Sequence, residues 1–432
     1  MQMCTKQVWQ RILVMAVVFA VSCFVGVYAQ NKQSGKNADK NKKPAEEVNV
    51  SKVMKEARTA VKSSNFAQAE SVLEKAMNSS DEARNDASLH FMLMNVEHGL
   101  VDAENRKIYL KNNPDTAKYF SYIYKVYKYG LSCDSLDRLP NRKGKVRPRY
   151  SSGISSRLLF YRNNVKSAGK YFYKKGKYSD AYKYFDLYLE TMHNPLVCDV
   201  KDAKPETDSL DIMRLAVYSA YNSSAYSNVK KYISVVMEDT ISYTTFCQIG
   251  SNTSFALGDT LEAIDYLNKG WKADPSREYF YITLVECQID RKQYDQAYTT
   301  VCTQLDRTPQ NRRLWYIKGK CLQCMDSLDS AIASYEHAVA IQNDDTLSYS
   351  SMGDIYVIKA QQTYHANNFK AGTSSYSQLK KQETDFYKKA LGNYEKARSF
   401  APNNPTLWYE GLREVYFKLN MGKQLNQLEK EK

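Results

Sequence analysis

Two cysteines, Cys321 and Cys324, form a Cys-x-x-Cys pair in the stretch YIKGKCLQCMDSLDSAIASYEHAVAIQ at residues 316–342. Such a pair can be the redox centre of a thiol–disulfide enzyme or half of a zinc site. The sequence contains no second Cys-x-x-Cys that would complete a zinc site. On a helix, residues three apart have Cβ atoms about 5–6 Å apart, whereas a disulfide needs about 3.5–4.5 Å. We interpret the pair as structural, with an envelope thiol–disulfide enzyme as the alternative.

The other residues with catalytic or metal-binding potential form no recognisable motif. The five histidines show no metal-ligand spacing; they are His90, His98, His193, His337 and His365. His90 and His98 are expected on one helix, where eight residues of separation place them about 12 Å apart, too far to share an ion. The sequence contains no glycine-rich phosphate loop and no G-x-S-x-G motif. It therefore predicts no catalytic residue, no metal and no cofactor.

The composition favours packed helices over a β-sandwich. The 432-residue chain contains only 17 Gly and 10 Pro but 35 Tyr, so turn-forming residues are scarce and large amphipathic residues are common. A chain of this length suits two domains or one extended array.

The N-terminus has the features of a secretory signal peptide. Lys6 and Arg11 precede an apolar run over residues 12–27, and Val27-Tyr28-Ala29 is acceptable to signal peptidase. We expect cleavage after Ala29, which would place the protein in the periplasm or at the outer membrane. Lipidation at Cys23 and an uncleaved anchor are alternatives, and both also place the chain outside the cytoplasm. Residues 30–50 are rich in Lys and Asn without apolar periodicity, which is typical of a disordered tether.

The chain is basic even without this segment. Removing residues 1–29 leaves 59 Lys and Arg against 47 Asp and Glu, a net charge of +12. An exported protein rarely meets nucleic acid, so we expect an acidic protein, anionic lipid or envelope polysaccharide as the partner.

The sequence repeats itself every 34 residues. Ala263, Ala297 and Ala331 lie 34 apart, and each opens a run in which apolar residues recur at helical spacing. Pro275 and Pro309 repeat the same interval. Because one pair of helices cannot bury both of its faces, successive pairs are expected to stack.

These residues resemble the tetratricopeptide repeat, which places two antiparallel helices in 34 residues. Residues 312–345 carry its signature positions as Trp315, Gly319, Leu322, Ala331, Tyr335 and Ala338, with Asn343 in place of the usual proline. Residues 162–195 and 244–277 match it in part. The resemblance implies an all-α fold, a right-handed α-solenoid of stacked antiparallel helix pairs that follows the signal peptide and the tether.

The repeat divides the chain into segments. We expect a signal peptide (1–29), a tether (30–50), N-terminal tetratricopeptide-like repeats (51–137), a basic linker (138–155), one repeat with a degenerate helical repeat (156–243), C-terminal repeats (244–404) and a capping helix (405–432). In the last repeat, the signature residues from Ala390 onward arrive 25 residues late. An insertion near 364–388 is therefore expected to lengthen both helices and their turn.

The repeat also places the cysteines. Cys321 and Cys324 fall late in a first helix, near the negative end of its dipole, whereas catalytic pairs lie at a helix N-terminus. Cys133 and Cys198 lie in loop-like stretches and can pair. Seven cysteines follow the signal peptide, so in an oxidising compartment at least one thiol stays free.

A triplet of Asp, Ser or Thr, and an aliphatic residue recurs along the chain, as in Asp115-Thr116-Ala117 and Asp259-Thr260-Leu261. It resembles the O-glycosylation site of some exported bacterial proteins. It is also typical of a helix N-cap, where Asp or Ser accepts hydrogen bonds from free backbone N–H groups.

The resemblance also indicates a binding surface, because tetratricopeptide proteins line a concave groove with first-helix residues. The residues predicted to contact a partner are Lys166, Lys170, Tyr173, Lys174, Arg313, Tyr316, Lys320, Tyr409, Arg413 and Tyr416. This basic, tyrosine-rich set suits an acidic or extended peptide. The Lys/Asn/Arg set of the family's chaperone-binding carboxylate clamp has no counterpart that we can place here.

A second basic feature is the loop RLPNRKGKVRPRY, which contains Arg138, Arg142, Lys143, Lys145, Arg147 and Arg149. It can be an ordinary solvated loop, or it can dock an acidic partner or anionic lipid headgroups.

Together these patterns predict a non-catalytic scaffold of the cell envelope that binds a protein or peptide, with a role as an accessory of outer-membrane or secretion assemblies within that class. Membrane contact is expected only through an N-terminal anchor or peripheral basic residues. A binder of anionic lipid or glycan is the alternative that charge alone supports.

Overall fold

The computed structural model describes residues 49–140, 143–198, 208–238, 242–366 and 370–430. Helices dominate these segments, and no strand occurs within them. The predicted signal peptide and residues 30–48 of the predicted tether lie outside the described residues. In the part of the chain that is described, no helix is long and apolar enough to cross a membrane.

The N-terminal half consists of longer helices, most of them in pairs, with four one-turn helices. The long helices are α2 (Val50–Lys62), α3 (Phe66–Ser79), α5 (Ala87–Tyr109), α6 (Thr116–Asp137), α7 (Ser151–Lys174), α8 (Tyr178–Glu190) and α10 (Ser209–Asn222). One-turn helices follow α3, α8 and α10; they are α4 (Asp81–Arg84), α9 (Pro195–Cys198), α11 (Tyr226–Val229) and α12 (Ile233–Val236).

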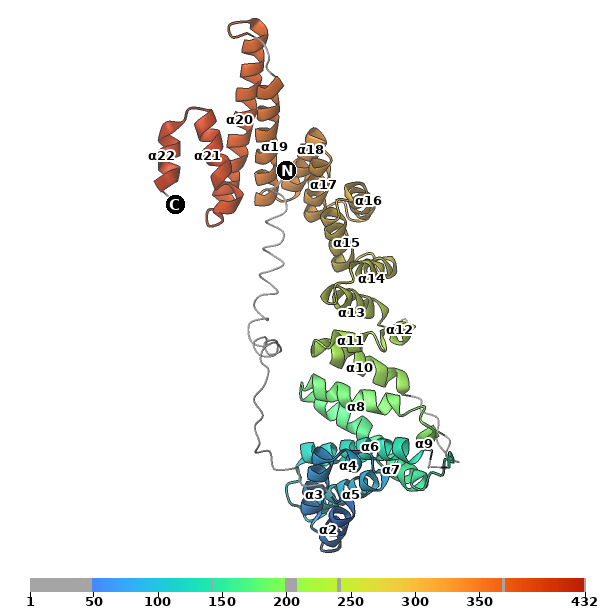
Figure 1. Ribbon diagram of the computed structural model, residues 1–432. Coiled ribbons are helices and arrows are strands. Elements are labelled where there is room, and N and C mark those ends of the chain that lie inside the picture. Colours follow the sequence, from blue (N-terminus) through green and yellow to red (C-terminus); the bar gives the residue numbers. More distant parts are fainter. Residues whose placement is uncertain (1–48, 141–142, 199–207, 239–241, 367–369, 431–432) are drawn as a thin grey trace, which may run out of the picture.

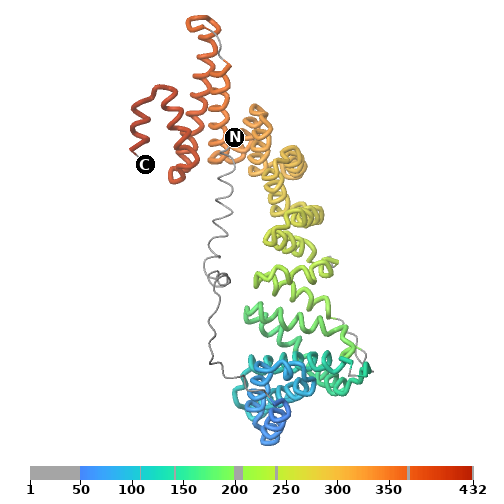
Figure 2. The backbone as a smooth tube through the Cα atoms, viewed as in Figure 1, coloured from blue at the N-terminus to red at the C-terminus, as the bar shows by residue number. Residues whose placement is uncertain are grey.

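The C-terminal half continues the same arrangement. Its helices are α13 (Tyr243–Ala256), α14 (Thr260–Ala273), α15 (Glu278–Asp290), α16 (Tyr294–Leu305), α17 (Arg312–Cys324), α18 (Leu328–Ile341), α19 (Thr346–Ala366), α20 (Ser374–Phe400), η1 (Pro405–Leu407), α21 (Tyr409–Lys418) and α22 (Gly422–Lys430). The pairs stack in sequence order into an elongated column, with α2–α7 at one end and α19–α22 at the other (Figure 1). The backbone trace shows the stack bending at its C-terminal end (Figure 2).

Side-chain caps start several of these helices. Asp115 accepts a hydrogen bond from the Lys118 backbone N–H at 3.0 Å, and Asp259 accepts one from Glu262 N–H at 3.0 Å. Each satisfies a backbone donor that has no partner within its own helix. Both aspartates open one of the recurring triplets, so the N-cap interpretation is confirmed at these two places.

Small residues let the two helices of a pair approach closely. Ala263, Ala297 and Ala331, spaced at 34 residues, are fully buried. Gly319 in α17 lies against the ring of Tyr335 in α18, and a Cβ atom at Gly319 would be 2.6 Å from that ring. The ring therefore occupies the space that a side chain would need, as expected for a small residue in one helix opposite an aromatic in the next.

The turns inside the pairs share one backbone conformation. Ser224, Gly258, Lys292 and Asp326 all have positive φ, at 57°, 81°, 59° and 59°. These four residues are spaced at 34-residue intervals, and each follows a first helix. Such a left-handed residue ends a helix by allowing the next N–H groups to bond back to its last carbonyls. The 34-residue spacing thus continues through residues 208–243, where the sequence shows only a degenerate repeat.

Two features distinguish the C-terminal end. α19 and α20 contain 21 and 27 residues, against 13 and 14 in α17 and α18, so the inserted residues extend both helices into a projecting hairpin (Figure 1). The segment predicted as a single capping helix instead forms η1, α21 and α22. Asn420 breaks it, because its positive φ of 57° ends α21 before α22 begins.

Candidate partner-binding face

The first helices of successive pairs carry the residues that were predicted to line the groove, and their outward surface is here called the first-helix face. Asn252 of α13 donates a hydrogen bond from Nδ2 to the Tyr221 hydroxyl of α10, at 2.9 Å. The Tyr279 hydroxyl of α15 donates to Asn252 Oδ1 at 2.7 Å. These partly exposed side chains link three successive first helices. The sequence analysis did not name these residues. Asn252 and Tyr279 nevertheless occupy the same positions of their repeats as Lys320 and Arg313, which were predicted to line the groove.

On α7 the predicted lysines form a stripe at four-residue spacing. Lys170 and Lys174 are exposed, whereas Lys166 forms an ion pair with Asp208 at 2.8 Å. The hydrogen bond from Lys166 holds the pKa of Asp208 below its usual range. Tyr173 is half-buried and packs edge-on against Tyr178. This part of the first-helix face is basic and accessible, but Lys166 is already engaged within the chain.

On α17 the same face carries both signs of charge. Arg313 lies 3.2 Å from Glu278 and 3.5 Å from Glu286, both on α15. Desolvation raises the pKa of Asp290 above its usual range, and the positive charge of Lys320 opposes this rise. The basic character predicted here is therefore offset by acids of the preceding repeat, which the sequence analysis did not place on the face. Tyr316 is half-buried against Tyr335.

On α21 the prediction fails for one residue. Tyr416 has only 4 % of its surface exposed and belongs to the core that joins α19–α22, because α21 turns this side chain inward between its neighbours. Arg413 pairs with Glu410 at 3.4 Å and Glu429 at 3.6 Å. Tyr409 is half-buried.

The predicted basic loop is anchored at its two ends. Arg138 bonds Asp134 at 2.7 Å, which raises the pKa of the guanidinium. The buried carboxylate of Asp137 accepts hydrogen bonds from the backbone N–H groups of Arg149 and Tyr150. Lys143, Lys145 and Arg147 are exposed between these anchors. Arg142 lies outside the described residues.

None of the described cysteines forms a disulfide, and the burial of Cys321 favours the structural interpretation. Cys321 is fully buried, and burial raises the pKa of its thiol to about 12. A thiol with so high a pKa is a poor nucleophile at neutral pH. Cys324 is the last residue of α17.

Cys133 and Cys198 do not lie as expected. Cys133 is buried inside α6 rather than in a loop, and its thiol donates to the Ala87 carbonyl at 3.1 Å. Burial is the main reason for the pKa of about 12 of this thiol. Cys198 ends the one-turn helix α9 and is exposed.

These surroundings predict the reactivity of the thiols. With an aromatic disulfide reagent near pH 7, we expect Cys198 to react rapidly and Cys321 to react only when the repeats unfold. The Cys198→Ser variant should lose the fast phase, and the Cys321→Ser variant should keep it. A rapid phase that disappears in Cys321→Ser instead would restore the thiol–disulfide enzyme as a candidate.

The stacked helix pairs, several of which have a glycine in one helix against an aromatic ring of the next, define an α-solenoid. Residues 254–321, from the end of α13 through most of α17, match the model of the tetratricopeptide repeat family. Residues 254–321 are identified as tetratricopeptide repeats. This family and its repeat packing support a protein-interaction scaffold.

Solved structures of helical repeat proteins are similar to parts of this chain, at low identity and with TM-scores below 0.5. The C-terminal part of a tetratricopeptide repeat protein from Cytophaga hutchinsonii is 14% identical, with 60% of this chain and 91% of that chain covered and a TM-score of 0.42. A tetratricopeptide repeat protein from Bacteroides fragilis is 15% identical over 60% of this chain and 98% of that chain, with a TM-score of 0.29. The protein MamA is 18% identical over 44% of this chain and 89% of that chain, with a TM-score of 0.34. No curated protein matches the sequence.

Proposed function

We propose that this protein is a non-catalytic scaffold of the cell envelope that binds an acidic segment of a partner protein through its basic middle region, residues 118–183. This region spans α6, the basic loop, α7 and the start of α8. The localisation rests on the signal-like N-terminus, and the partner class rests on charge.

One observation carries the proposal. Residues 118–183 contain 17 Lys and Arg and three Asp, a net charge of +14. That equals the net charge of the whole chain, so the other 366 residues sum to zero. A charge excess confined to one-sixth of the chain creates a local positive potential that attracts and orients an acidic partner.

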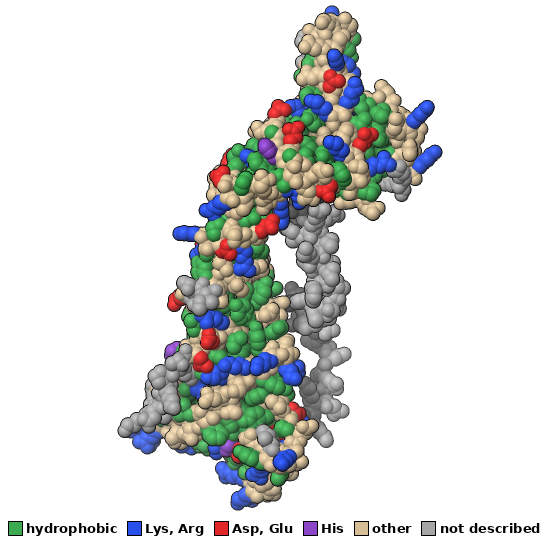
Figure 3. All heavy atoms as spheres, turned by 180° about the vertical axis from the view of Figure 1, so that it is seen from behind, with side chains coloured by type: hydrophobic (Ala, Val, Ile, Leu, Met, Phe, Trp, Pro, Cys, Tyr) green, Lys and Arg blue, Asp and Glu red, His purple; other side chains and the backbone are tan. Residues whose placement is uncertain are grey.

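One accessible part of this region lies around the α7–α8 turn. Lys170, Lys174, Lys175 and Lys177 are all exposed there. A row of Lys and Arg side chains crosses the lower half of the solenoid in the space-filling view, whereas both signs of charge are interspersed higher up (Figure 3). A partner held by such exposed charges would bind in a salt-dependent manner, because the Debye length falls to about 8 Å at physiological ionic strength.

The test is recovery of a partner from solubilised envelope with the full chain at low and high salt. The variant Lys170→Glu/Lys174→Glu/Lys177→Glu should reduce recovery at least about tenfold, which corresponds to about 1.4 kcal/mol. The matched control Lys272→Glu/Lys381→Glu/Lys423→Glu changes the net charge equally at exposed sites on other helices. It should retain the partner.

Two results would contradict the proposal. Equal loss of the partner in both triple variants would mean that overall charge, not this region, governs binding. Recovery of anionic lipid or glycan in place of a protein, lost in the same variant, would instead support the surface-binding alternative.

A further inference from the structure

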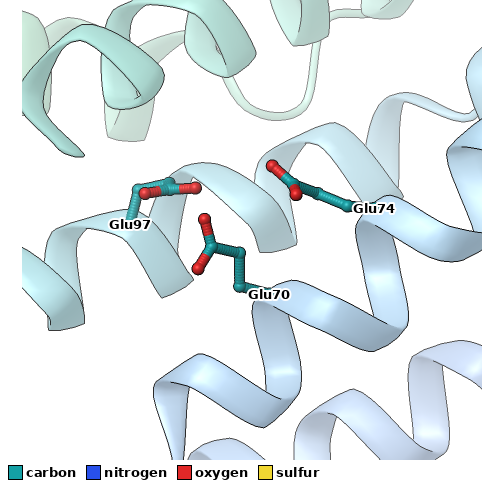
Figure 4. Close-up of side chains that lie close together, drawn as sticks. All are labelled: Glu70, Glu74 and Glu97. Carbon is teal, nitrogen blue, oxygen red and sulfur yellow. The ribbon is translucent and has the colours of Figure 1, made fainter. Parts of the chain in front are cut away.

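Three glutamates of the N-terminal pairs converge on one point. Glu70 and Glu74 lie one turn apart on α3, and Glu97 comes from α5. One carboxylate oxygen from each residue lies within 4.8 Å of those of the other two, and the three side chains point toward a common centre (Figure 4). Oxygens at such separations can bind one cation at metal–oxygen distances of about 2.0–2.6 Å. Sequence reasoning missed the cluster because Glu97 is 23 residues beyond Glu74 and has no motif around it.

Glu97 is the most deeply buried residue of this cluster. Its side chain is fully buried, and neither carboxylate oxygen has a hydrogen-bond partner. The closest cation is the ammonium group of Lys125 on α6, 3.4 Å from Oε1. A buried ionised carboxylate without hydrogen bonds is costly, so this group must either hold a proton or acquire a closer cation.

The charges in the cluster do not balance. Lys125 bonds Glu70 directly and Glu74 at 2.9 Å, and Tyr129 donates its hydroxyl to Glu74 at 2.8 Å. Three carboxyl groups thus face one ammonium group. A divalent cation would supply two positive charges and would bond directly to the Glu97 oxygen, from which the ammonium group of Lys125 is 3.4 Å away.

The cluster is open enough for an ion to enter. The side chains of Glu70, Glu74 and Lys125 are 18%, 36% and 28% exposed, while Glu97 lies beneath them. Lys125 has a flexible four-carbon chain, so its ammonium group can move outward into water without a change in the backbone.

We propose that Glu70, Glu74 and Glu97 bind a hard divalent cation of the Ca²⁺, Mg²⁺ or Mn²⁺ class, which displaces the ammonium group of Lys125. All three ligands are carboxylate oxygens, the donors that these ions prefer over soft metals. The bound ion would tie α3 to α5 and so join the first helix pair to the second. Lys125 competes with the ion for the same oxygens, which predicts an affinity in the range of weak extracellular sites, about 10⁻⁴–10⁻³ M.

The probe is Tb³⁺, an analogue of Ca²⁺ whose luminescence a nearby tyrosine can sensitise; here that is Tyr129. With the full chain, stripped with a chelator that is then removed, we expect a saturable signal that Ca²⁺ reverses. Glu97→Gln should weaken binding at least about tenfold, because it removes a charged ligand and keeps the shape. Glu56→Gln, at an exposed carboxylate on α2, is the matched control and should bind as the native chain does.

Lys125→Met removes the competing ammonium group and keeps much of the side chain's length. It should bind Tb³⁺ and Ca²⁺ at least about tenfold more tightly than the native chain. If this variant is unfolded without metal, Ca²⁺ should restore its helical circular dichroism, which is again the expected result. No saturable signal from the native chain up to about 10 mM Ca²⁺ or Tb³⁺, or unchanged binding in Glu97→Gln, would overturn the proposal.

Discussion

Replacing Glu97 with glutamine is expected to remove most of the pH dependence of the stability of the N-terminal repeats. Burial, followed by the charge of Glu70, raises the pKa of Glu97 to about 9, and the charge of Lys125 opposes this shift. The reference pKa is 4.5, so between pH 4.5 and 9 the folded chain holds a proton that the unfolded chain releases. Stability therefore decreases as the pH rises through this window.

The free energy of unfolding should fall by at most about 1.4 kcal/mol per pH unit. The native chain should therefore lose up to about 3 kcal/mol of stability between pH 6 and pH 8. Glutamine carries no charge at either pH, so Glu97→Gln should show a nearly flat profile and should exceed the native chain in stability at pH 8.

The measurement is urea unfolding at pH 6, 7 and 8 with a chelator present, which separates the proton from any metal. Hydrogen exchange of the α3 and α5 amides would localise the effect, because a solenoid need not unfold as one unit. Glu82→Gln, at an exposed carboxylate on α4, is the control and should follow the native profile. A profile in Glu97→Gln as steep as that of the native chain would show that other groups carry the pH dependence.

Replacing Gly270 with alanine is expected to loosen the contact between α14 and α15. A Cβ atom at Gly270 would lie 2.2 Å from the ring of Phe280, which is closer than atoms can approach. Phe280 is fully buried among Cys247, Leu267 and Leu284, so its ring cannot move without displacing them. Overpacking of this kind costs about 1–3 kcal/mol.

A second glycine supplies a control, because its replacement by alanine should raise stability rather than lower it. Gly392 lies within α20, and a Cβ atom there would meet nothing within 4 Å. Gly392→Ala should therefore stabilise its helix by about 1 kcal/mol, the difference in helix propensity. Thermal unfolding of both variants checks the pair. Equal, small effects of the same sign would mean that the ring of Phe280 can relax and that this contact is not a tight constraint.

Much of the fold follows from local sequence patterns. The alanines at 34-residue spacing and the contact between Gly319 and Tyr335 were predictable, because a small residue in one helix and an aromatic in the next lie within a single repeat. The repeat through residues 208–243 was harder to see. Its turn residue, Ser224, adopts the same positive φ as Gly258, Lys292 and Asp326 although the four residue types differ.

The candidate sites depended more on contacts between repeats. Sequence reasoning placed Arg313 on the binding face but could not pair it with Glu278 and Glu286. It also placed Tyr416 on that face, whereas the packing of α21 buries it. In each case the outcome depends on how one helix is rotated and shifted against another.

The sequence by itself determined that this protein is a stack of helix pairs, that its net positive charge is concentrated in residues 118–183, and that Cys321 and Cys324 fall within a repeat helix. The tertiary structure alone decided which charges face one another, including the meeting of Glu70, Glu74 and Glu97 beneath Lys125. The physical reason is the range of the interactions. Helix formation and packing within a pair depend on residues a few turns apart, whereas contacts between pairs depend on the geometry of the whole stack.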